Sequence, residues 1–275
     1  MSDFFDLMIV PFTACLVLTG IHSYVGFHVL ERGVIFVDLA LAQIAALGAT
    51  VGFLLGYDLH SNGSYFISLG FTLGGALVFS LTRTRREAIP QEAFIGISYA
   101  VAAAAAVLIL SRAADGGEEL KGLLVGHLLF VSWHEVFYIF GMYSLVGIFH
   151  FIFRKRFFLI SCSPHDAFES GVSIRLWDFL FYASFGLVVT SSVELAGVLL
   201  VFSFLIAPAV CGKLLAQGTK SRLAIGWGVG FGASIIGISL SYFFDLPTGA
   251  TIVCVFGALV LVSILFPPCF CVRET

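Results

Sequence analysis

Nine apolar runs, separated by short polar segments, limit how this chain can fold more than any other feature of its sequence. Each run is about as long as a helix that crosses a bilayer, which needs roughly 20 apolar residues at a rise of about 1.5 Å per residue. The runs are Leu7–Leu30, Val34–Gly56, Ser64–Leu81, Ala93–Leu110, Val136–Phe153, Leu176–Val193, Leu195–Leu215, Leu223–Phe244 and Ala250–Phe266. Only 11% of the 275 residues are charged, against about 25% in ordinary soluble domains. The sequence predicts an all-α, polytopic transmembrane helix bundle of about eight or nine spans, formed as one domain over residues 1–275.

Two segments leave the number of spans between eight and nine. Polar residues at Ser191–Glu194 interrupt an apolar stretch of about 40 residues, which as a single helix would overshoot the bilayer twofold. We therefore expect a break at those residues. Gly122–Val131 is apolar but only about half a span long, which is typical of a re-entrant or interfacial segment that packs on protein.

The Lys and Arg residues predict the orientation of the spans, because cytoplasmic loops of membrane proteins are enriched in basic residues. With the N-terminus outside, only Arg112 and Lys121 fall in outer segments. The basic residues that then lie inside are Arg32, Arg83, Arg85, Arg86, Arg154, Lys155, Arg156, Arg175, Lys213, Lys220, Arg222 and Arg273. An odd number of spans, with the N-terminus out and the C-terminus in, places every loop on the side that this charge rule predicts.

Glycines spaced four residues apart indicate where helices pack closely. They are the row Gly48, Gly52 and Gly56, the pair Gly70 and Gly74, and the pair Gly228 and Gly232. Lipid gives helices no hydrophobic reason to associate, so close backbone approach through glycine supplies much of the contact. We expect tight helix packing at all three places.

Acidic side chains within the apolar runs are candidate functional residues, because a charge at mid-helix costs about 2.5–3.5 kcal/mol on insertion scales. Asp38 lies about one turn inside the second run, and Glu194 lies between the sixth and the seventh. Glu92, Glu135 and Asp178 are near the ends of runs, where a carboxylate can reach headgroup water. Asp38 and Glu194 are therefore the first candidates.

Two histidines, His22 and His28, lie in the first apolar run. A lone histidine in a span is more often hydrogen-bonded within the packing than used as a ligand. Imidazole and carboxylate together nevertheless form a ligand set that transition metals accept. No two histidines of the chain stand four residues apart, so any metal site must be assembled across helices.

The chain lacks the signature of a nucleotide-binding subunit. It contains no Gly-x-x-x-x-Gly-Lys-Ser/Thr loop, and the residues before Gly212 and Lys213 cannot cradle phosphates. No Ser/His/Asp nucleophile pattern stands out, and a net charge of −3 argues against nucleic acid as a partner. The sequence predicts a protein that is not an enzyme, so that any ATP hydrolysis driving transport belongs to a separate chain.

Five segments carry recognisable motifs: Arg32–Gly48, Glu92–Ile97, Ser163–Asp178, Glu194–Ala209 and Asp245–Ile252. The first resembles the second-span signature of the permeases of the zinc/manganese/iron-type ABC transporter family. The third is similar to the cytoplasmic segment of these permeases, the fourth to the span that follows it, and the fifth to their last loop. Since the five follow the order of the family and are spread over most of the chain, from residue 32 to residue 252, the resemblance is specific.

This resemblance implies the membrane-spanning permease subunit of an ATP-driven importer of a divalent transition metal ion, zinc, manganese or iron, in the bacterial plasma (inner) membrane. The metal ion is the cargo, and no permanently bound cofactor is implied. The implied partners are a second copy of the permease in a homodimer, two cytoplasmic ATPase subunits and an extracytoplasmic metal-binding protein.

Three alternatives remain open from the sequence. The first is an ABC permease for a chelated or organic cargo such as a siderophore or a vitamin. The second is a stand-alone ion-coupled transporter, which would have broken helices at mid-membrane in both halves. The third is a membrane scaffold without transport, which would leave Asp38 and Glu194 unexplained.

The second span departs from the family pattern at one position. Family members usually carry a histidine four residues after the aspartate, whereas here Ala42 holds that place and Gln43 follows. The side chains of Asp38 and Gln43 leave an ideal helix about 140° apart. Either His22 or His28 supplies an imidazole, or the site prefers a harder metal with oxygen ligands. The predicted metal-contacting residues are Asp38, Gln43, His22, His28 and Glu194.

The family resemblance also implies that residues 154–175 form a cytoplasmic segment that couples the permease to its ATPase. Pro164 precedes and Gly171 follows a stretch without Pro or Gly, which predicts about a turn and a half of helix. In this helix the resemblance favours docking into the ATPase, with Ala167 and Phe168 as the apolar contact and Asp166 and Glu169 as a polar rim. An exposed helix that touches no partner is the alternative.

Overall fold

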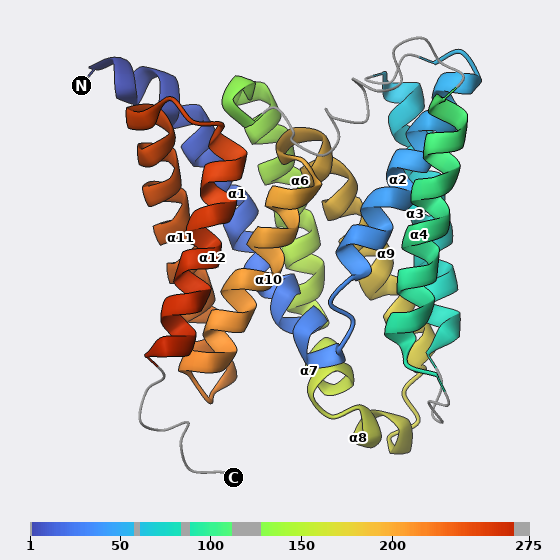
Figure 1. Ribbon diagram of the computed structural model, residues 1–275. Coiled ribbons are helices and arrows are strands. Elements are labelled where there is room, and N and C mark those ends of the chain that lie inside the picture. The colour runs from blue at the N-terminus through green and yellow to red at the C-terminus, as the bar shows by residue number, and fades with distance from the viewer. Residues whose placement is uncertain (1, 58–60, 84–88, 112–127, 267–275) are drawn as a thin grey trace. The chain divides into compact units, whose positions relative to one another are not determined.

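The computed structural model describes residues 2–57, 61–83, 89–111 and 128–266, with the side chains of residues 2–6 left out. Regular secondary structure in these ranges is helical (Figure 1). The helices are α1 (Ser2–Arg32), α2 (Val37–Leu54), α3 (Asn62–Thr82), α4 (Gln91–Leu110), the 3-10 turn η1 (Leu128–Phe130), α6 (Trp133–Ile152), α7 (Arg154–Cys162), α8 (Pro164–Glu169), α9 (Ile174–Ala196), α10 (Val198–Leu215), α11 (Thr219–Phe244) and α12 (Thr248–Leu265).

Nine of the helices in the described ranges are long and apolar enough to cross a bilayer, and α7 and α8 are the short exceptions. This confirms the predicted all-α, polytopic bundle. Residues 122–127 of the expected half-span segment lie outside the described residues, and the remainder holds the η1 turn.

The break between α9 and α10 lies at Gly197 and not at the predicted Ser191–Glu194. Gly197 has a φ of 78°, which side chains with a Cβ rarely adopt, so the helix stops there. The serines upstream stay helical because their hydroxyls bond back to carbonyls of the preceding turn: Ser192 Oγ donates to the Val188 carbonyl oxygen at 2.6 Å. Polar residues in a span therefore do not by themselves end a helix.

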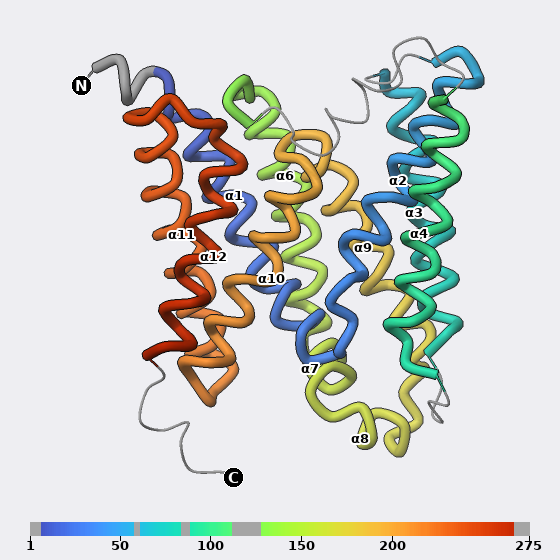
Figure 2. The backbone as a smooth tube through the Cα atoms, in the orientation of Figure 1, coloured from blue at the N-terminus to red at the C-terminus, as the bar shows by residue number. Residues whose placement is uncertain are grey.

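Residue contacts divide the chain into two compact units. Unit 1 comprises Met1–Leu30, Val125–Leu145 and Leu195–Thr275, and unit 2 comprises Glu31–Leu124 and Val146–Glu194. In unit 1, helices α10, α11 and α12 pack on one another, as the backbone trace in Figure 2 shows. In unit 2, α2 packs on both α3 and α4. Helix α2 carries Asp38, the first candidate functional residue.

Glycine allows α2 and α3 to approach closely at Gly48 and Gly52, as the spacing predicts, but not at Gly56, where a Cβ would meet nothing within 4 Å among the described residues. A Cβ added at Gly48 would lie 2.7 Å from the Ser68 Cα, so any larger residue would push the two helices apart. The prediction is wrong for the other two pairs, because a Cβ there would meet nothing within 4 Å in the described part of the chain: Gly70, Gly74, Gly228 and Gly232. Spacing places glycines on one helix face but does not say which face meets a neighbour.

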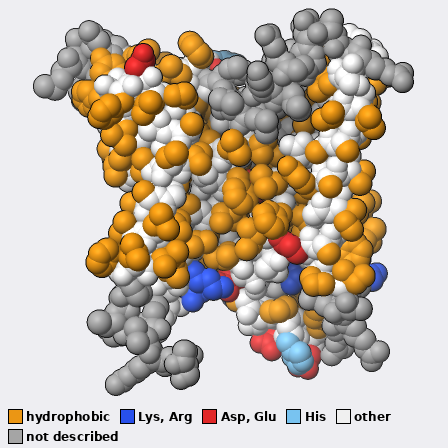
Figure 3. Space-filling view, viewed as in Figure 1, with side chains coloured by type: hydrophobic (Ala, Val, Ile, Leu, Met, Phe, Trp, Pro, Cys, Tyr) orange, Lys and Arg blue, Asp and Glu red, His pale blue; other side chains and the backbone are white. Residues whose placement is uncertain are grey.

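The outer faces of the long helices are apolar. Hydrophobic side chains cover the visible faces of these helices in Figure 3, while acidic and histidine side chains gather over α8. Large apolar residues such as Leu108, Leu145 and Phe243 are more than half exposed. Such surfaces suit contact with lipid hydrocarbon and exclude contact with water over most of the span.

Candidate functional site

Asp38 occupies the first turn of α2, directly after the connection from α1. Gly33 turns the chain there with a φ of 68°, and the Val37 N–H donates to the Val34 carbonyl oxygen at 3.1 Å. The Asp38 side chain is 1% exposed, and neither carboxylate oxygen accepts a hydrogen bond from the described residues. Buried polar groups in proteins are almost always hydrogen-bonded, so this carboxylate is exceptional and marks a candidate binding group.

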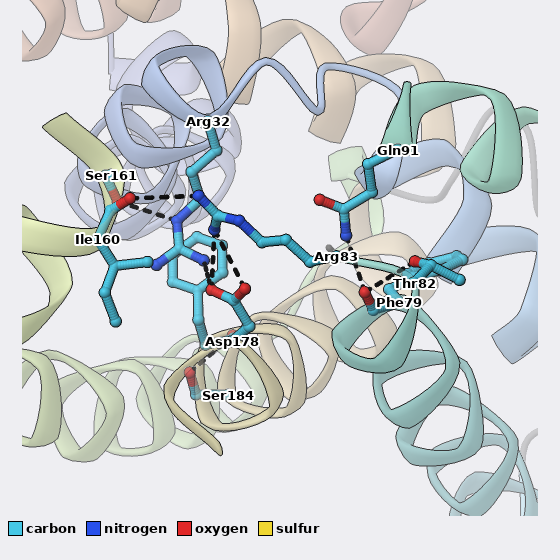
Figure 4. Close-up of polar contacts among 10 residues, drawn as sticks. Arg32, Phe79, Thr82, Arg83, Gln91, Ile160, Ser161, Asp178 and Ser184 are labelled. Carbon is cyan, nitrogen blue, oxygen red and sulfur yellow. Dashed lines mark hydrogen bonds and ion pairs between the residues drawn. The ribbon is translucent and has the colours of Figure 1, made fainter. Parts of the chain in front are cut away.

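Glu92 fixes the start of the helix that carries Asp38. Its Oε1 accepts a hydrogen bond of 2.9 Å from the Phe36 N–H, one residue before α2 begins. Glu92 itself stands in the first turn of α4, and the neighbouring Gln91 Nε2 donates to the Phe79 carbonyl oxygen of α3 at 2.8 Å (Figure 4). A carboxylate at a helix N-terminus also stabilises the helix dipole. The role of Glu92 is thus to position the N-terminus of α2.

Two further predicted metal contacts, Gln43 and Glu194, lie in unit 2 with Asp38. Gln43 is buried one and a half turns further along α2, whereas Glu194 is exposed near the end of α9. Nowhere in the described ranges do three or more His, Cys, Asp or Glu side chains come close enough together to hold a metal ion. The described residues therefore do not form a complete ligand shell from these side-chain types.

Both candidate histidines are buried in unit 1. The His22 Nδ1 lies 2.9 Å from the Leu18 carbonyl oxygen; because a carbonyl only accepts, Nδ1 carries the proton and a neutral ring keeps its lone pair on Nε2. The His28 ring contacts Tyr24 and Phe27 edge to face, at centroid distances of 4.8 and 5.4 Å.

Glu135 has a structural role. Its Oε2 accepts hydrogen bonds from the Ser132 N–H at 2.7 Å and from the Ser132 hydroxyl at 2.6 Å, and the Ser132 Oγ accepts in turn from the Glu135 N–H at 3.3 Å. This reciprocal arrangement is a capping box at the start of α6. It accounts for an acidic residue at the end of an apolar run without any metal.

The sequence did not reveal a buried arginine–aspartate cluster in unit 2, formed by Arg32, Arg83 and Asp178 (Figure 4). Arg32 Nη1 donates to Asp178 Oδ1 at 2.6 Å, and Arg83 Nη1 donates to both oxygens of Asp178 at 3.0 and 3.1 Å. The side chains of Arg32 and Asp178 are fully buried, and the Arg32 guanidinium lies 3.9 Å from the centroid of the Phe181 ring. Two basic groups thus share one carboxylate.

The cluster connects segments that are far apart in the sequence. Arg32 ends α1, Arg83 follows α3 and Asp178 stands in the first turns of α9. Arg32 Nε also donates to the Ser161 hydroxyl at 2.9 Å, and Arg83 Nη2 donates to the Ile160 carbonyl oxygen at 3.3 Å. The cluster therefore fastens α7, the first helix of the predicted coupling segment, to the connection that leads into α2.

The predicted coupling helix exists as α8, which spans Pro164–Glu169 and is followed by Gly171 with a φ of 70°. Ala167 is fully buried and packs with Ile160 and Ile174, so its side chain offers no exposed surface to a partner. Phe168 is half-buried against the same apolar cluster. Asp166 and Glu169 are exposed, as expected for a polar rim, and Glu169 Oε1 lies 3.6 Å from His165 Nδ1.

Comparison with known proteins agrees with this architecture. A family model described as the ABC 3 transport family matches residues 4–267. The chain is 25% identical to the manganese import system permease protein ScaB of Streptococcus gordonii, over 98% of this chain and 94% of that protein. A Haemophilus influenzae relative named for iron transport is 23% identical, over 95% of this chain and 94% of its own length.

The fold also has a solved counterpart. The structure described as PsaBC from Streptococcus pneumoniae in complex with Fab matches with a TM-score of 0.78 and 22% identity, over 97% of this chain and 96% of that chain. At this level of identity the match supports the fold. Because the family model covers almost the entire length, the chain belongs to the ABC 3 transport family.

Proposed function

We propose that this chain is the membrane-spanning permease subunit of an ATP-driven importer of a divalent transition metal ion, and that Mn²⁺ is its cargo. Membership of the ABC 3 transport family and the names of the relatives support transport of a metal ion. The single observation that carries the proposal is the Asp38 carboxylate, buried in α2 with no hydrogen-bond donor among the described residues.

A carboxylate buried in this way needs a positive partner, because burying an ionised group alone is costly. A divalent cation that passes through the protein supplies such a partner. Carboxylate and carbonyl oxygens suit Mn²⁺, whereas imidazole suits zinc and iron. The carboxylate of Asp38 therefore favours manganese, and Gln43, His22, His28 and Glu194 are proposed to contact the ion at other points of its path.

The same proposal assigns ATP hydrolysis to a separate partner, because the chain has no phosphate-binding loop. We place the docking site on α8, where Asp166 and Glu169 are exposed, Phe168 is half-buried and Gly171 ends the segment. Ala167 supports this helix from within. A second permease copy and an extracytoplasmic metal-binding protein complete the proposed assembly in the bacterial plasma membrane.

The experiment is ATP-dependent uptake of radioactive Mn²⁺, Fe²⁺ and Zn²⁺ into proteoliposomes that hold this chain with its partner ATPase, supplied with ATP on the ATPase side and with the metal-binding protein on the opposite side. We expect Mn²⁺ to accumulate fastest and to stay fastest when the three metals compete. Preferred uptake of iron or zinc would overturn the manganese assignment, but the proposal that the chain is a metal permease would stand. Absence of ATP-dependent uptake of all three metals would overturn the importer itself.

A further inference from the structure

The junction between α6 and α7 forms a pocket that lies outside α8, the helix on which the proposed function places the docking of the ATPase. Its volume is about 380 Å³. Six consecutive residues line it, apolar before the junction and basic after it: Phe151, Ile152, Phe153, Arg154, Lys155 and Arg156. One side of the pocket is therefore hydrocarbon-like, and the other carries three positive charges.

These three charges are available to a ligand. Arg154, Lys155 and Arg156 are exposed and form no ion pair with a described residue. Arg32 and Arg83, in contrast, are already engaged by Asp178. Arg154, Lys155 and Arg156, which no described residue pairs, thus have the composition of an anion-binding surface.

Aromatic rings hold two of the basic groups in place. The guanidinium carbon of Arg154 lies 4.4 Å from the centroid of the Phe151 ring, and that of Arg156 lies 5.3 Å from the centroid of the Trp177 ring. Cation–π contacts of this kind restrain a guanidinium while its N–H groups remain able to donate at the edges. The restraint lowers the entropy that an anion must remove on binding.

The position of the pocket along α6 identifies the layer of the bilayer that it faces. Helix α6 has 20 residues, which at about 1.5 Å per residue span roughly 30 Å, the thickness of the hydrocarbon core. The basic residues directly after α6 therefore lie at headgroup level, and the charge distribution of the whole chain assigns them to the cytoplasmic side. Phe151 and Ile152 are 66% and 65% exposed, at the depth of the acyl chains.

We propose that the α6–α7 junction binds an anionic phospholipid, with its phosphate on Arg154, Lys155 and Arg156 and an acyl chain along Phe151 and Ile152. Basic pockets beside membrane-spanning helices recognise anionic headgroups in this way, and each basic residue near the surface raises the affinity roughly fivefold. The apolar half of the pocket distinguishes a lipid from a free phosphate ion, because only the lipid has an acyl chain that can contact it.

Trp177 is a reporter within the site, because it lies under Arg156. We would keep Trp177 as the only tryptophan, in the full chain with Trp133→Phe and Trp227→Phe, and reconstitute it into phosphatidylcholine vesicles. Bromine atoms near the headgroup end of the acyl chain, carried either by phosphatidylglycerol or by phosphatidylcholine, quench a tryptophan that they approach. We expect brominated phosphatidylglycerol to quench Trp177 at a mole fraction at least about fivefold lower than brominated phosphatidylcholine requires for the same quenching.

A charge-matched pair of variants separates this site from general surface charge. Lys155→Gln with Arg156→Gln should abolish the preference for phosphatidylglycerol. The control is Arg175→Gln with Lys220→Gln, which removes one Lys and one Arg that are exposed and do not line the pocket. This double variant should keep the preference for phosphatidylglycerol. Native mass spectrometry of the chain with all its tryptophans gives a second count of bound phosphatidylglycerol.

Three results would overturn the proposal. One is equal quenching by the two brominated lipids, and another is an unchanged preference in the Lys155→Gln and Arg156→Gln double variant. The third is loss of the preference when about 10 mM inorganic phosphate is added, since a site selective for lipid resists that competitor and a site for free phosphate does not.

Discussion

Replacing Asp178 with asparagine tests whether the arginine–aspartate cluster holds the segments of unit 2 together. The change removes the carboxylate that Arg32 and Arg83 share, at a side chain that is fully buried. Removing one partner of a buried ion pair costs about 3–5 kcal/mol, because the other charge is left uncompensated. At about 2–4 °C per kcal/mol, the midpoint of thermal unfolding should fall by roughly 6–20 °C.

The matched variant is Arg83→Gln, which leaves the pair of Arg32 and Asp178 with one charge of each sign. Only the hydrogen bonds of Arg83 are lost, and such bonds to charged groups contribute about 1.5–3 kcal/mol. Unfolding in detergent, followed by tryptophan fluorescence at a fixed scan rate, should therefore rank the proteins as wild type, Arg83→Gln and Asp178→Asn. An Asp178→Asn midpoint within about 2 °C of wild type, or one above that of Arg83→Gln, would refute this reasoning.

Helix packing, coupling and orientation each give a further measurable expectation. Gly48→Ala should lower the unfolding midpoint, because its Cβ would lie 2.7 Å from the backbone of α3 and overpacking costs about 1–3 kcal/mol; Gly74→Ala is the control, and equal midpoints would contradict the packing. In Phe168→Asp the partner ATPase should still hydrolyse ATP while metal uptake falls, since the change buries an unpaired charge at the proposed docking helix. Unchanged uptake would show that α8 is not the coupling element. A membrane-impermeant maleimide should label Arg175→Cys from the cytoplasmic side and Leu246→Cys from the outer side, and the opposite pattern would reverse the orientation.

The spans and the short helix α8 could be predicted because their signals are local. Each span follows from the length of one apolar run, which the bilayer thickness sets. The short helix α8 follows from Pro164 and Gly171 around it, and the structure begins it at Pro164 and ends it at Glu169, each one residue earlier than expected. Neither inference requires knowledge of a neighbouring helix.

Features that depend on neighbours could not be predicted. Arg32 and Asp178 are 146 residues apart, and Arg83 and Asp178 are 95 apart. Counting the basic residues of each loop therefore places both arginines on the cytoplasmic side but does not pair them with Asp178. Ser192 looks like a helix interruption until its bond to the Val188 carbonyl oxygen is known. The burial of Asp38 was indicated by its depth in an apolar run, but its lack of a donor became visible only in the structure.

The central claim is that Asp38 serves the passage of a metal ion and not the stability of the fold. The most direct test measures ATP-dependent Mn²⁺ uptake and thermal unfolding on the same preparation of Asp38→Asn, with Asp38→Ala beside it. Asparagine keeps the shape of the side chain and removes a buried charge for which no described residue offers a donor, so the unfolding midpoint should stay constant or rise.

Uptake by Asp38→Asn should fall at least about tenfold, the scale on which a metal site weakens when it loses even a supporting group. Glu135→Gln is the matched carboxylate-to-amide control, because glutamine also completes a capping box, and it should transport at the wild-type rate. The account predicts a stable Asp38→Asn protein that no longer imports Mn²⁺. Wild-type uptake by that variant, or a loss of uptake accompanied by an equal loss of folded protein, would contradict it.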